Sequence, residues 1–144
     1  MKKEKLLLLV LDAAGDKGLS PVQLQKSVFL IQQSIPSQSK EKYAFAPYNY
    51  GPFDKHIYLD ADELSSNGLV SKERCPDRSW QKYCVTDEGK TSAKAVASAE
   101  DEKIVRFVGK IVSWVQSLTF EQLLASVYKK YPEYKINSVF RNLE

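Results

Sequence analysis

Residues 68–89 read GLVSKERCPDRSWQKYCVTDEG, and this stretch predicts a β-hairpin that leads into a helix. One strand runs from Leu69 to Cys75 and the other from Trp80 to Thr86. Between them lies Pro76-Asp-Arg-Ser79, four residues that favour a tight turn. Thr86 or Asp87 then begins the next helix, because both side chains can accept hydrogen bonds from the free amides of a first turn.

The predicted register of this hairpin also separates the two cysteines. It places Cys84 opposite Ser71 and Cys75 opposite Trp80. The thiols then lie about four residues apart along the ladder, roughly 13 Å at the rise of a strand, which is too far for a disulfide. We therefore expect two free thiols, as suits a cytosolic chain.

Two helices are predicted upstream of the hairpin. The first spans Lys3 to Ala14 and ends at Gly15, the residue type that most often follows a helix. The second spans Pro21 to about Ser34, with Ser20 as its cap and Pro21 in the first position. Its inward face repeats at spacings of four, three and four residues, and consists of Leu24, Val28, Ile31 and Ile35.

The most unusual segment is residues 43–53, YAFAPYNYGPF, which holds five aromatic residues. Pro47 and Pro52 exclude a helix, and the alternation of Tyr43 and Phe45 with alanines predicts a short strand. Asp54 is then expected to cap a helix that runs to about Asn67 and Gly68. The inward face of this helix is predicted to be Ile57, Ala61 and Leu64.

The last third of the chain is predicted to be helical. An apolar stripe consists of Ile104, Phe107, Val108, Ile111, Val115 and Leu118. Thr119-Phe-Glu-Gln122 fits a capping box and opens a helix that Pro132 ends. The inward face of that helix is expected to be Leu123, Leu124, Val127, Tyr128 and Tyr131, and a last helical turn is expected at Ile136, Val139 and Phe140.

These elements predict a mainly α protein with a small β-hairpin, in the α+β class. The order helix, helix, short strand, helix, hairpin, helix is that of a winged helix-turn-helix with an expanded middle. We expect residues 1–99 to form this winged-helix-like domain and residues 100–144 to form a helical extension packed on it as one structural unit.

Composition sets limits on function. The 144 residues carry a net charge of +3, which is too small to indicate nucleic acid or an anionic membrane as a partner. The apolar run from Leu6 to Leu11 is too short for a secretory signal, and no stretch approaches the roughly 20 apolar residues of a membrane span. We expect a cytoplasmic protein with no membrane partner.

Several segments together resemble a known family. They are LQKSVFLI at 24–31, the aromatic segment 43–53 ending in Gly-Pro-Phe, Ile57-Tyr58 in the following helix, and Gly68-Leu-Val70 after it. This combination resembles the Panacea (SocA-like) domain and the related YwgA-like bacterial proteins, over residues 5–90 and more loosely over the tail at 131–139. The resemblance implies a winged-helix-like fold, a prophage, toxin–antitoxin or defence context, and an antitoxin-like or adaptor role without enzymatic activity.

DNA binding is the alternative function. The segments that could contact DNA carry both positive and negative side chains. The helix after the aromatic segment is a poor reader of DNA, because residues 54–70 hold four carboxylates and one lysine. The hairpin is more favourable, although Glu73 and Asp77 offset part of its positive charge. The DNA-binding candidates are Lys72, Arg74, Arg78, Trp80 and Lys82.

Protein recognition fits the aromatic residues better. Tyr48 and Tyr50 are the expected exposed pair, whereas Phe45 and Phe53 also fit a role in covering the gap between helices. Trp114 lies outside the apolar stripe of its helix. Two interpretations remain open: it contacts a second copy of the chain in a homodimer, or it covers the end of the core. The protein-binding candidates are Tyr48, Tyr50, Phe53, His56, Leu59 and Trp114, and the expected partner is a toxin or defence effector.

The residues give little support for catalysis. His56 is the only histidine, and no nucleophile pattern, phosphate loop or metal-ligand pair accompanies it. Asp60, Asp62 and Glu63 are interpreted as a solvated acidic surface. Lys26 is interpreted as a structural residue that pairs with an acidic neighbour. We therefore expect no enzymatic activity, no cofactor and no metal.

Overall fold

The computed structural model describes residues 1–35, 42–135 and 137–138. The helices are α1 (Lys3–Ala14), α2 (Pro21–Ser34), α3 (His56–Ser66), α4 (Asp87–Ser98), α5 (Glu102–Ser117) and α6 (Phe120–Lys130), with 3₁₀ turns η1 (Gly15–Lys17) and η2 (Pro132–Lys135). The strands are β1 (Ala46–Tyr48), β2 (Gly51–Phe53), β3 (Val70–Arg74) and β4 (Gln81–Val85). The predicted class is confirmed, since the fold is mainly helical with two small antiparallel strand pairs.

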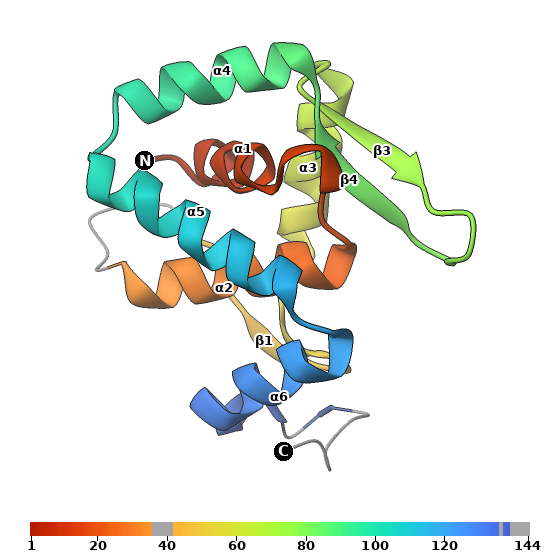
Figure 1. The fold of residues 1–144 in the computed structure, drawn as a ribbon. Helices are drawn as coiled ribbons and strands as arrows, with labels where there is room; N and C mark the ends of the chain where they lie inside the picture. Colours follow the sequence, from red (N-terminus) through yellow and green to blue (C-terminus); the bar gives the residue numbers. More distant parts are fainter. Residues whose placement is uncertain (36–41, 136, 139–144) are drawn as a thin grey trace.

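Helix α1 lies at the centre of the molecule, with α4 on one side and α5 on the other (Figure 1). Residues 7–11 are all buried, because a nearly continuous apolar run needs cover on more than one side. Helix α5 supplies part of that cover, and Val108 and Val112 belong to the same core as α1. The described part of the C-terminal third therefore shares its core with the N-terminal helices.

The β3–β4 hairpin has the predicted register. Ser71 lies opposite Cys84, and both cysteines are free thiols. The hairpin gains a third backbone partner that the sequence did not predict, because Leu19 and Tyr83 exchange hydrogen bonds of 3.0 and 2.8 Å. Gly18 allows this approach, since an added Cβ would lie 2.5 Å from the Tyr83 carbonyl oxygen.

The aromatic segment differs from the prediction of a single strand at Tyr43 and Phe45. It forms an antiparallel hairpin, β1–β2, in which Pro47 lies opposite Pro52. Prolines fit here because each strand has only one strand partner. Helix α3 begins at His56, two residues beyond the predicted cap, and Asp54 Oδ1 still accepts a hydrogen bond from the His56 amide at 2.9 Å.

The inward faces of the helices follow the predicted patterns with several corrections. On α2, Leu24, Val28 and Ile31 are buried as predicted, whereas Ile35 is half-buried. On α3, Ile57, Ala61 and Leu64 are buried as predicted. On α5 the buried residues are Val108, Val112 and Val115, whereas the predicted Ile104, Phe107, Ile111 and Leu118 are only half-buried. Helix α5 packs on α1 and α2. Only part of its apolar surface is fully buried in this contact.

Helix α6 begins with the predicted capping box at Thr119 and Gln122 and buries Leu123, Leu124, Val127 and Tyr128. Tyr131 is half-buried. The last turn predicted at Ile136, Val139 and Phe140 lies outside the described residues.

The hairpin meets α4 at a glycine that a larger residue cannot replace without movement. Thr86 caps α4 by accepting a hydrogen bond from the Gly89 amide at 3.0 Å. A Cβ at Gly89 would lie 2.0 Å from the Leu69 carbonyl oxygen and 2.6 Å from Val85 Cγ2. The close contact holds the end of the hairpin against the first turn of α4.

We predict that Gly89→Ala lowers the free energy of unfolding by about 2–3 kcal/mol, because the new methyl group overlaps backbone atoms. Gly109→Ala is the matched control in a helix interior, since an added Cβ there meets nothing within 4 Å. It should raise stability by about 0.5–1 kcal/mol. Urea unfolding measures both, and equal effects of the two substitutions would contradict the packing at Gly89.

Candidate functional site

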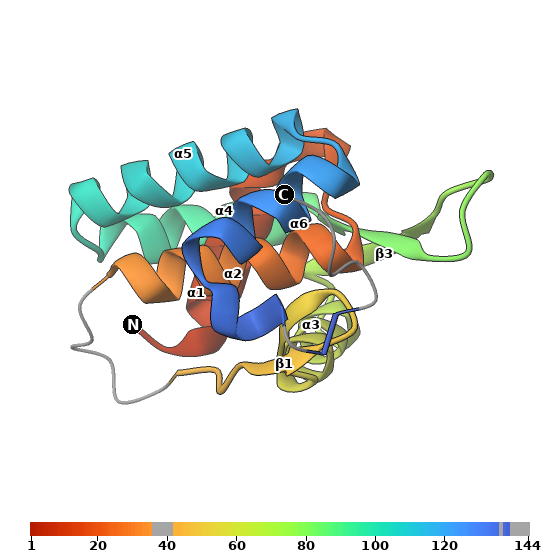
Figure 2. The ribbon, with the colours of Figure 1, turned by 90° about the horizontal axis from the view of Figure 1, so that it is seen from below.

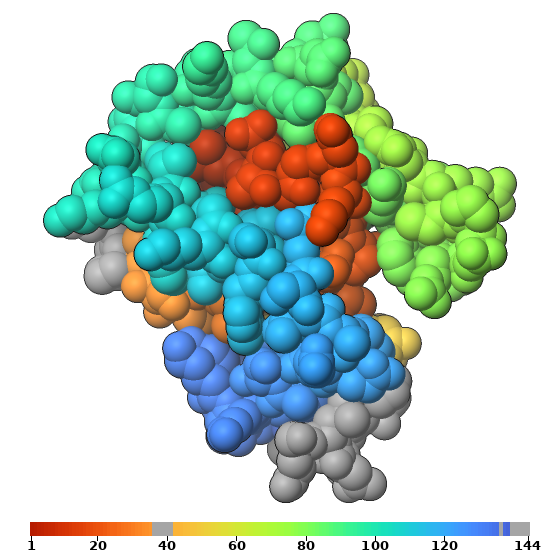
Figure 3. All heavy atoms as spheres, viewed as in Figure 1, coloured from red at the N-terminus to blue at the C-terminus, as the bar shows by residue number. Residues whose placement is uncertain are grey.

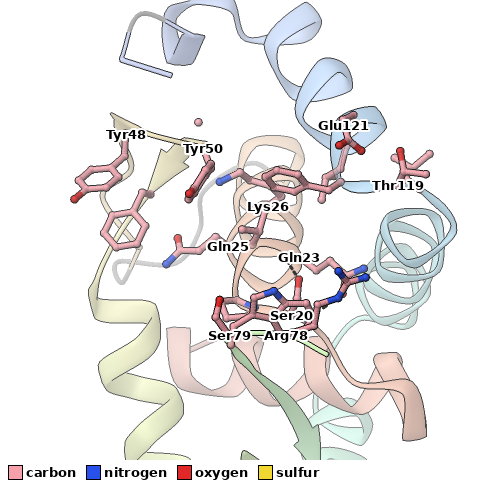
Figure 4. Close-up of a pocket in the computed structure, with 18 of the residues that line it drawn as sticks. Ser20, Gln23, Gln25, Lys26, Tyr48, Tyr50, Arg78, Ser79, Thr119 and Glu121 are labelled. Carbon is pink, nitrogen blue, oxygen red and sulfur yellow. Dashed lines mark hydrogen bonds between the residues drawn. The ribbon is translucent and has the colours of Figure 1, made fainter. Parts of the chain in front are cut away.

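A groove of about 1000 Å³ opens between the β1–β2 hairpin, the start of α2, the turn of the β3–β4 hairpin and the start of α6. In the space-filling view the β3–β4 hairpin projects from the body and a recess lies beneath it (Figure 3). Figure 4 shows the labelled residues converging on this space from four separate segments. The groove therefore exists only in the assembled fold.

The floor of the groove is formed by polar side chains of α2. Gln25 Nε2 donates to the Asp54 carbonyl at 2.9 Å, and Gln25 Oε1 accepts from the Asp54 amide at 3.1 Å. Beside it, Lys26 Nζ donates to the Pro52 carbonyl at 2.9 Å. These bonds attach the aromatic hairpin to α2 at the bottom of the groove.

Lys26 is the most unusual residue of this floor. Its side chain is only 2% exposed, and burial lowers its pKa to about 7. The predicted pairing with an acidic neighbour is wrong for the described residues, among which no carboxylate forms an ion pair with Lys26. The ammonium is instead held by a backbone carbonyl, a neutral partner.

Exposed aromatic rings form the rim. Tyr48 is 51% exposed, Tyr50 is 42% exposed, Trp80 is 38% exposed and Phe120 is 36% exposed. The rings of Tyr50 and Phe120 meet edge to face across the groove with centroids 5.7 Å apart. Tyr48 packs on Phe53 at 4.9 Å. The predicted exposure of Tyr48 and Tyr50 is confirmed, and Phe53 is half-buried.

The tail of the described chain fixes the turn that carries these tyrosines. The Tyr128 hydroxyl is hydrogen-bonded to Ser138 Oγ, and Ser138 Oγ donates to the Asn49 carbonyl at 3.2 Å. Gly51, at φ +93°, lies against the Tyr128 ring, where a Cβ would approach it to 3.1 Å. The aromatic turn is thus held by contacts from both α2 and α6.

The groove joins residues that the sequence analysis assigned to two different functions. Tyr48, Tyr50 and Phe53 line it, and so do Arg78 and Trp80 from the DNA-binding set. The remaining candidates lie elsewhere: His56, Leu59, Trp114, Lys72, Arg74 and Lys82. Sequence reasoning missed Phe120, whose only signal was its position one residue after a helix cap.

The acidic residues of α3 are more engaged than a solvated surface would be. Asp60 accepts a hydrogen bond from the Tyr43 hydroxyl at 2.7 Å, and burial together with Asp60 raises the pKa of that tyrosine. Asp62 pairs with Lys72 of β3 at 2.9 Å. In the part of the chain that the structure describes, no group of three or more His, Cys, Asp or Glu residues is arranged to hold a metal ion.

A separate cluster lies where the aromatic segment enters α3. Asp54 accepts hydrogen bonds from the amides of Ala44 and His56 and contacts His56 Nδ1 at 2.7 Å. Burial acts to raise the pKa of Asp54, but the bonds from His56 and Ala44 outweigh it and hold the pKa below its ordinary value. His56 is exposed and is not among the residues that line the groove.

Comparison with known proteins finds no family model that matches the chain and no significant match among curated proteins. Over residues 1–35, 42–135 and 137–138, none of the helices has the length and apolar character needed to cross a membrane.

Burial of Lys26 predicts a pH dependence of stability. The folded state releases the Lys26 proton near pH 7, whereas the unfolded chain holds it to about pH 10.4. Between these values the unfolded state binds more protons, so the free energy of unfolding rises with pH. Relative to Lys26→Met, the wild type should gain about 1–3 kcal/mol between pH 7 and pH 9 in urea unfolding. Parallel stability curves for the two proteins would contradict the lowered pKa.

Asp54 predicts a pH dependence of the same direction as that of Lys26, in the acid range instead. Because its folded pKa lies below the unfolded value of about 3.9, its contribution is complete above that value and is lost as pH falls through the folded pKa. Asp54→Asn should lower the free energy of unfolding by about 1–2 kcal/mol at pH 7. The difference from the wild type should shrink below pH 4 in urea unfolding. A difference that is constant with pH would refute this role of the carboxylate.

Proposed function

We propose that this protein is a non-enzymatic adaptor that binds a partner protein through the aromatic groove. The observation that carries the proposal is the rim of four exposed rings, Tyr48, Tyr50, Trp80 and Phe120, around a preformed hollow. Aromatic side chains are enriched at the centres of protein interfaces, because they bury a large area with little loss of side-chain freedom.

We further propose that the fold is a winged helix-turn-helix-like domain with a helical extension. Helices α1, α2 and α3 followed by the β3–β4 hairpin are in the order of that fold. The backbone bridge between Leu19 and Tyr83 supports the proposal, since it supplies a one-residue strand between α1 and α2 beside the wing. The domain would then span residues 1–99, with the extension at 100–144.

The same proposal includes the Panacea-like or YwgA-like family and an antitoxin-like or defence-associated role in the cytoplasm. It is supported by the position of the resembling segments. LQKSVFLI contributes Gln25 and Lys26 to the floor of the groove, and the aromatic segment contributes Tyr48 and Tyr50 to its rim. Two of the segments that carry the resemblance therefore meet at one site.

The polar groups of the groove support binding rather than catalysis. Ser20 and Thr119 both act as helix caps, and their oxygens accept hydrogen bonds from Gln23 and Gln122 amides at 3.1 Å. These hydroxyl oxygens therefore serve as caps of their helices. Lys26 Nζ is held by the Pro52 carbonyl at 2.9 Å.

DNA binding by the hairpin is the second candidate, favoured by the exposed Arg74 and Arg78. Other charges weigh against it, because Lys72 is paired with Asp62 and Lys82 lies opposite Glu73. The N-terminus, which carries Lys2, Lys3 and Lys5, and the turn of the β3–β4 hairpin also lie at opposite ends of the molecule in both views (Figures 1 and 2). A single basic face for DNA is therefore not formed by these groups.

The test is selection of a random dodecapeptide display library on the immobilised protein, followed by affinity measurements on synthetic peptides. Tyr50→Ala and Trp80→Ala should each weaken binding about tenfold or more, because each removes a rim ring of the kind that dominates interfaces. Trp114→Ala is the matched control, since Trp114 is 42% exposed, as is Tyr50, and lies outside the groove. It should leave affinity within twofold.

Equal loss in all three variants, or none in any, would contradict the groove as the binding site. A parallel titration with a mixed 30-bp DNA duplex at low and physiological salt examines the second candidate. Salt-steep binding that is lost in Arg74→Ala/Arg78→Ala would favour a transcriptional regulator instead.

A further inference from the structure

We propose that the floor of the groove is a carboxylate-binding site built around Lys26, and that the partner segment bound there carries an acidic group beside apolar side chains. The inference rests on the proposed protein-binding function and specifies the chemistry of the partner. It assigns Lys26 a role in recognition.

The first argument is the unmet demand of a buried cation. Lys26 is 2% exposed, yet its one hydrogen bond among the described residues goes to a neutral carbonyl. An ammonium has three donors, and burying its charge without an opposite charge is costly. A ligand carboxylate that reached Nζ from the groove would supply the missing charge and a second acceptor.

The second argument is that Lys26 is the charged donor of the floor. The first turns of α2 and α6 also begin at the groove, where capping boxes engage the amides of Ser20 and Gln23 and those of Thr119 and Gln122. Gln25 is occupied on both sides of its amide by the backbone of Asp54. Within the floor, Lys26 is therefore the positively charged group that could face an anion.

The third argument is charge complementarity across the groove. The charged residues that line it are Lys26, Arg78 and Glu121. Arg78 is exposed on the β3–β4 turn, and Figure 4 shows its guanidinium directed away from the hairpin toward the start of α6. Two cations against one exposed carboxylate favour an acidic occupant over a basic one.

The rim sets the remaining features of the occupant. A segment that places a carboxylate at Lys26 must pass the rings of Tyr50 and Phe120, which stand together at the groove. Apolar side chains on either side of the acidic residue would cover these rings and exclude water from the ion pair. Lower local polarity strengthens such a pair. An extended acidic and apolar segment of another protein is the occupant that fits both features.

The experiment is a cycle that changes Lys26 and the peptide carboxylate separately. Each acidic residue of a library-selected peptide is replaced by its amide, and affinities are measured at pH 6 against the wild type and Lys26→Met. We expect the acidic peptide to bind the wild type at least tenfold more tightly than the amide peptide. Against Lys26→Met this ratio should fall below twofold, and against Tyr50→Ala it should persist although both peptides bind more weakly.

Circular dichroism and urea unfolding establish that the variants are folded. Where Lys26→Met is not, Lys26→Gln replaces it, because glutamine keeps a donor for the Pro52 carbonyl. Arg78→Ala distinguishes the two cations. If the acid preference disappears in Arg78→Ala and survives in Lys26→Met, the proposal is overturned.

A second arm uses small probes and does not depend on the library. N-acetyl-phenylalanine and its amide are titrated into the ¹⁵N-labelled protein, and shifts of groove amides are followed. The free acid should bind more tightly than the amide in the wild type and not in Lys26→Met. Equal binding of acid and amide in both arms refutes the carboxylate site while leaving the groove intact, whereas peptides insensitive to Tyr50→Ala and Trp80→Ala refute the groove itself.

Discussion

The structure depends on the way α2 satisfies the backbone of the aromatic segment. That segment has one short hairpin of its own, and much of its backbone faces the helix instead of another strand. Three polar side chains of α2 meet it: Gln32 exchanges two hydrogen bonds with Tyr43, Gln25 exchanges two with Asp54, and Lys26 reaches Pro52. Buried amides and carbonyls must be paired, and here side chains of a buried helix pair them.

The groove is a consequence of that arrangement. Holding the backbone of residues 51–54 against α2 turns Tyr48 and Tyr50 outward, where they lie near the β3–β4 turn and the start of α6. The same bonds bring a lysine into the interior with no ion-pair partner among the described residues. The aromatic groove and the buried lysine thus have one origin, the polar residues that interrupt the apolar face of α2.

Helix positions and caps were predictable from the sequence, because Ser20, Thr86, Thr119 and Gly15 act locally. The hairpin register at Ser71 and Cys84 was predictable for the same reason. The second hairpin was not, since its strands contain prolines and depend on hydrogen bonds from Gln25 and Lys26. Within the groove, the sequence predicted the exposure of Tyr48 and Tyr50. Arg78 and Trp80 join them through the Leu19–Tyr83 bridge, which pairs residues far apart in the sequence.

The central position of α1 also affects how the chain reaches its native state. Its cover includes α4 and α5, and Gln116 donates to the Ala14 and Gly18 carbonyls from about a hundred residues away. During synthesis, α1 emerges well before α5 exists, so the part of its apolar surface that α5 covers stays exposed until α5 has been made. Contacts between distant residues slow folding, and exposed apolar helices aggregate. We expect the full core around α1 to form only after α5 has been made.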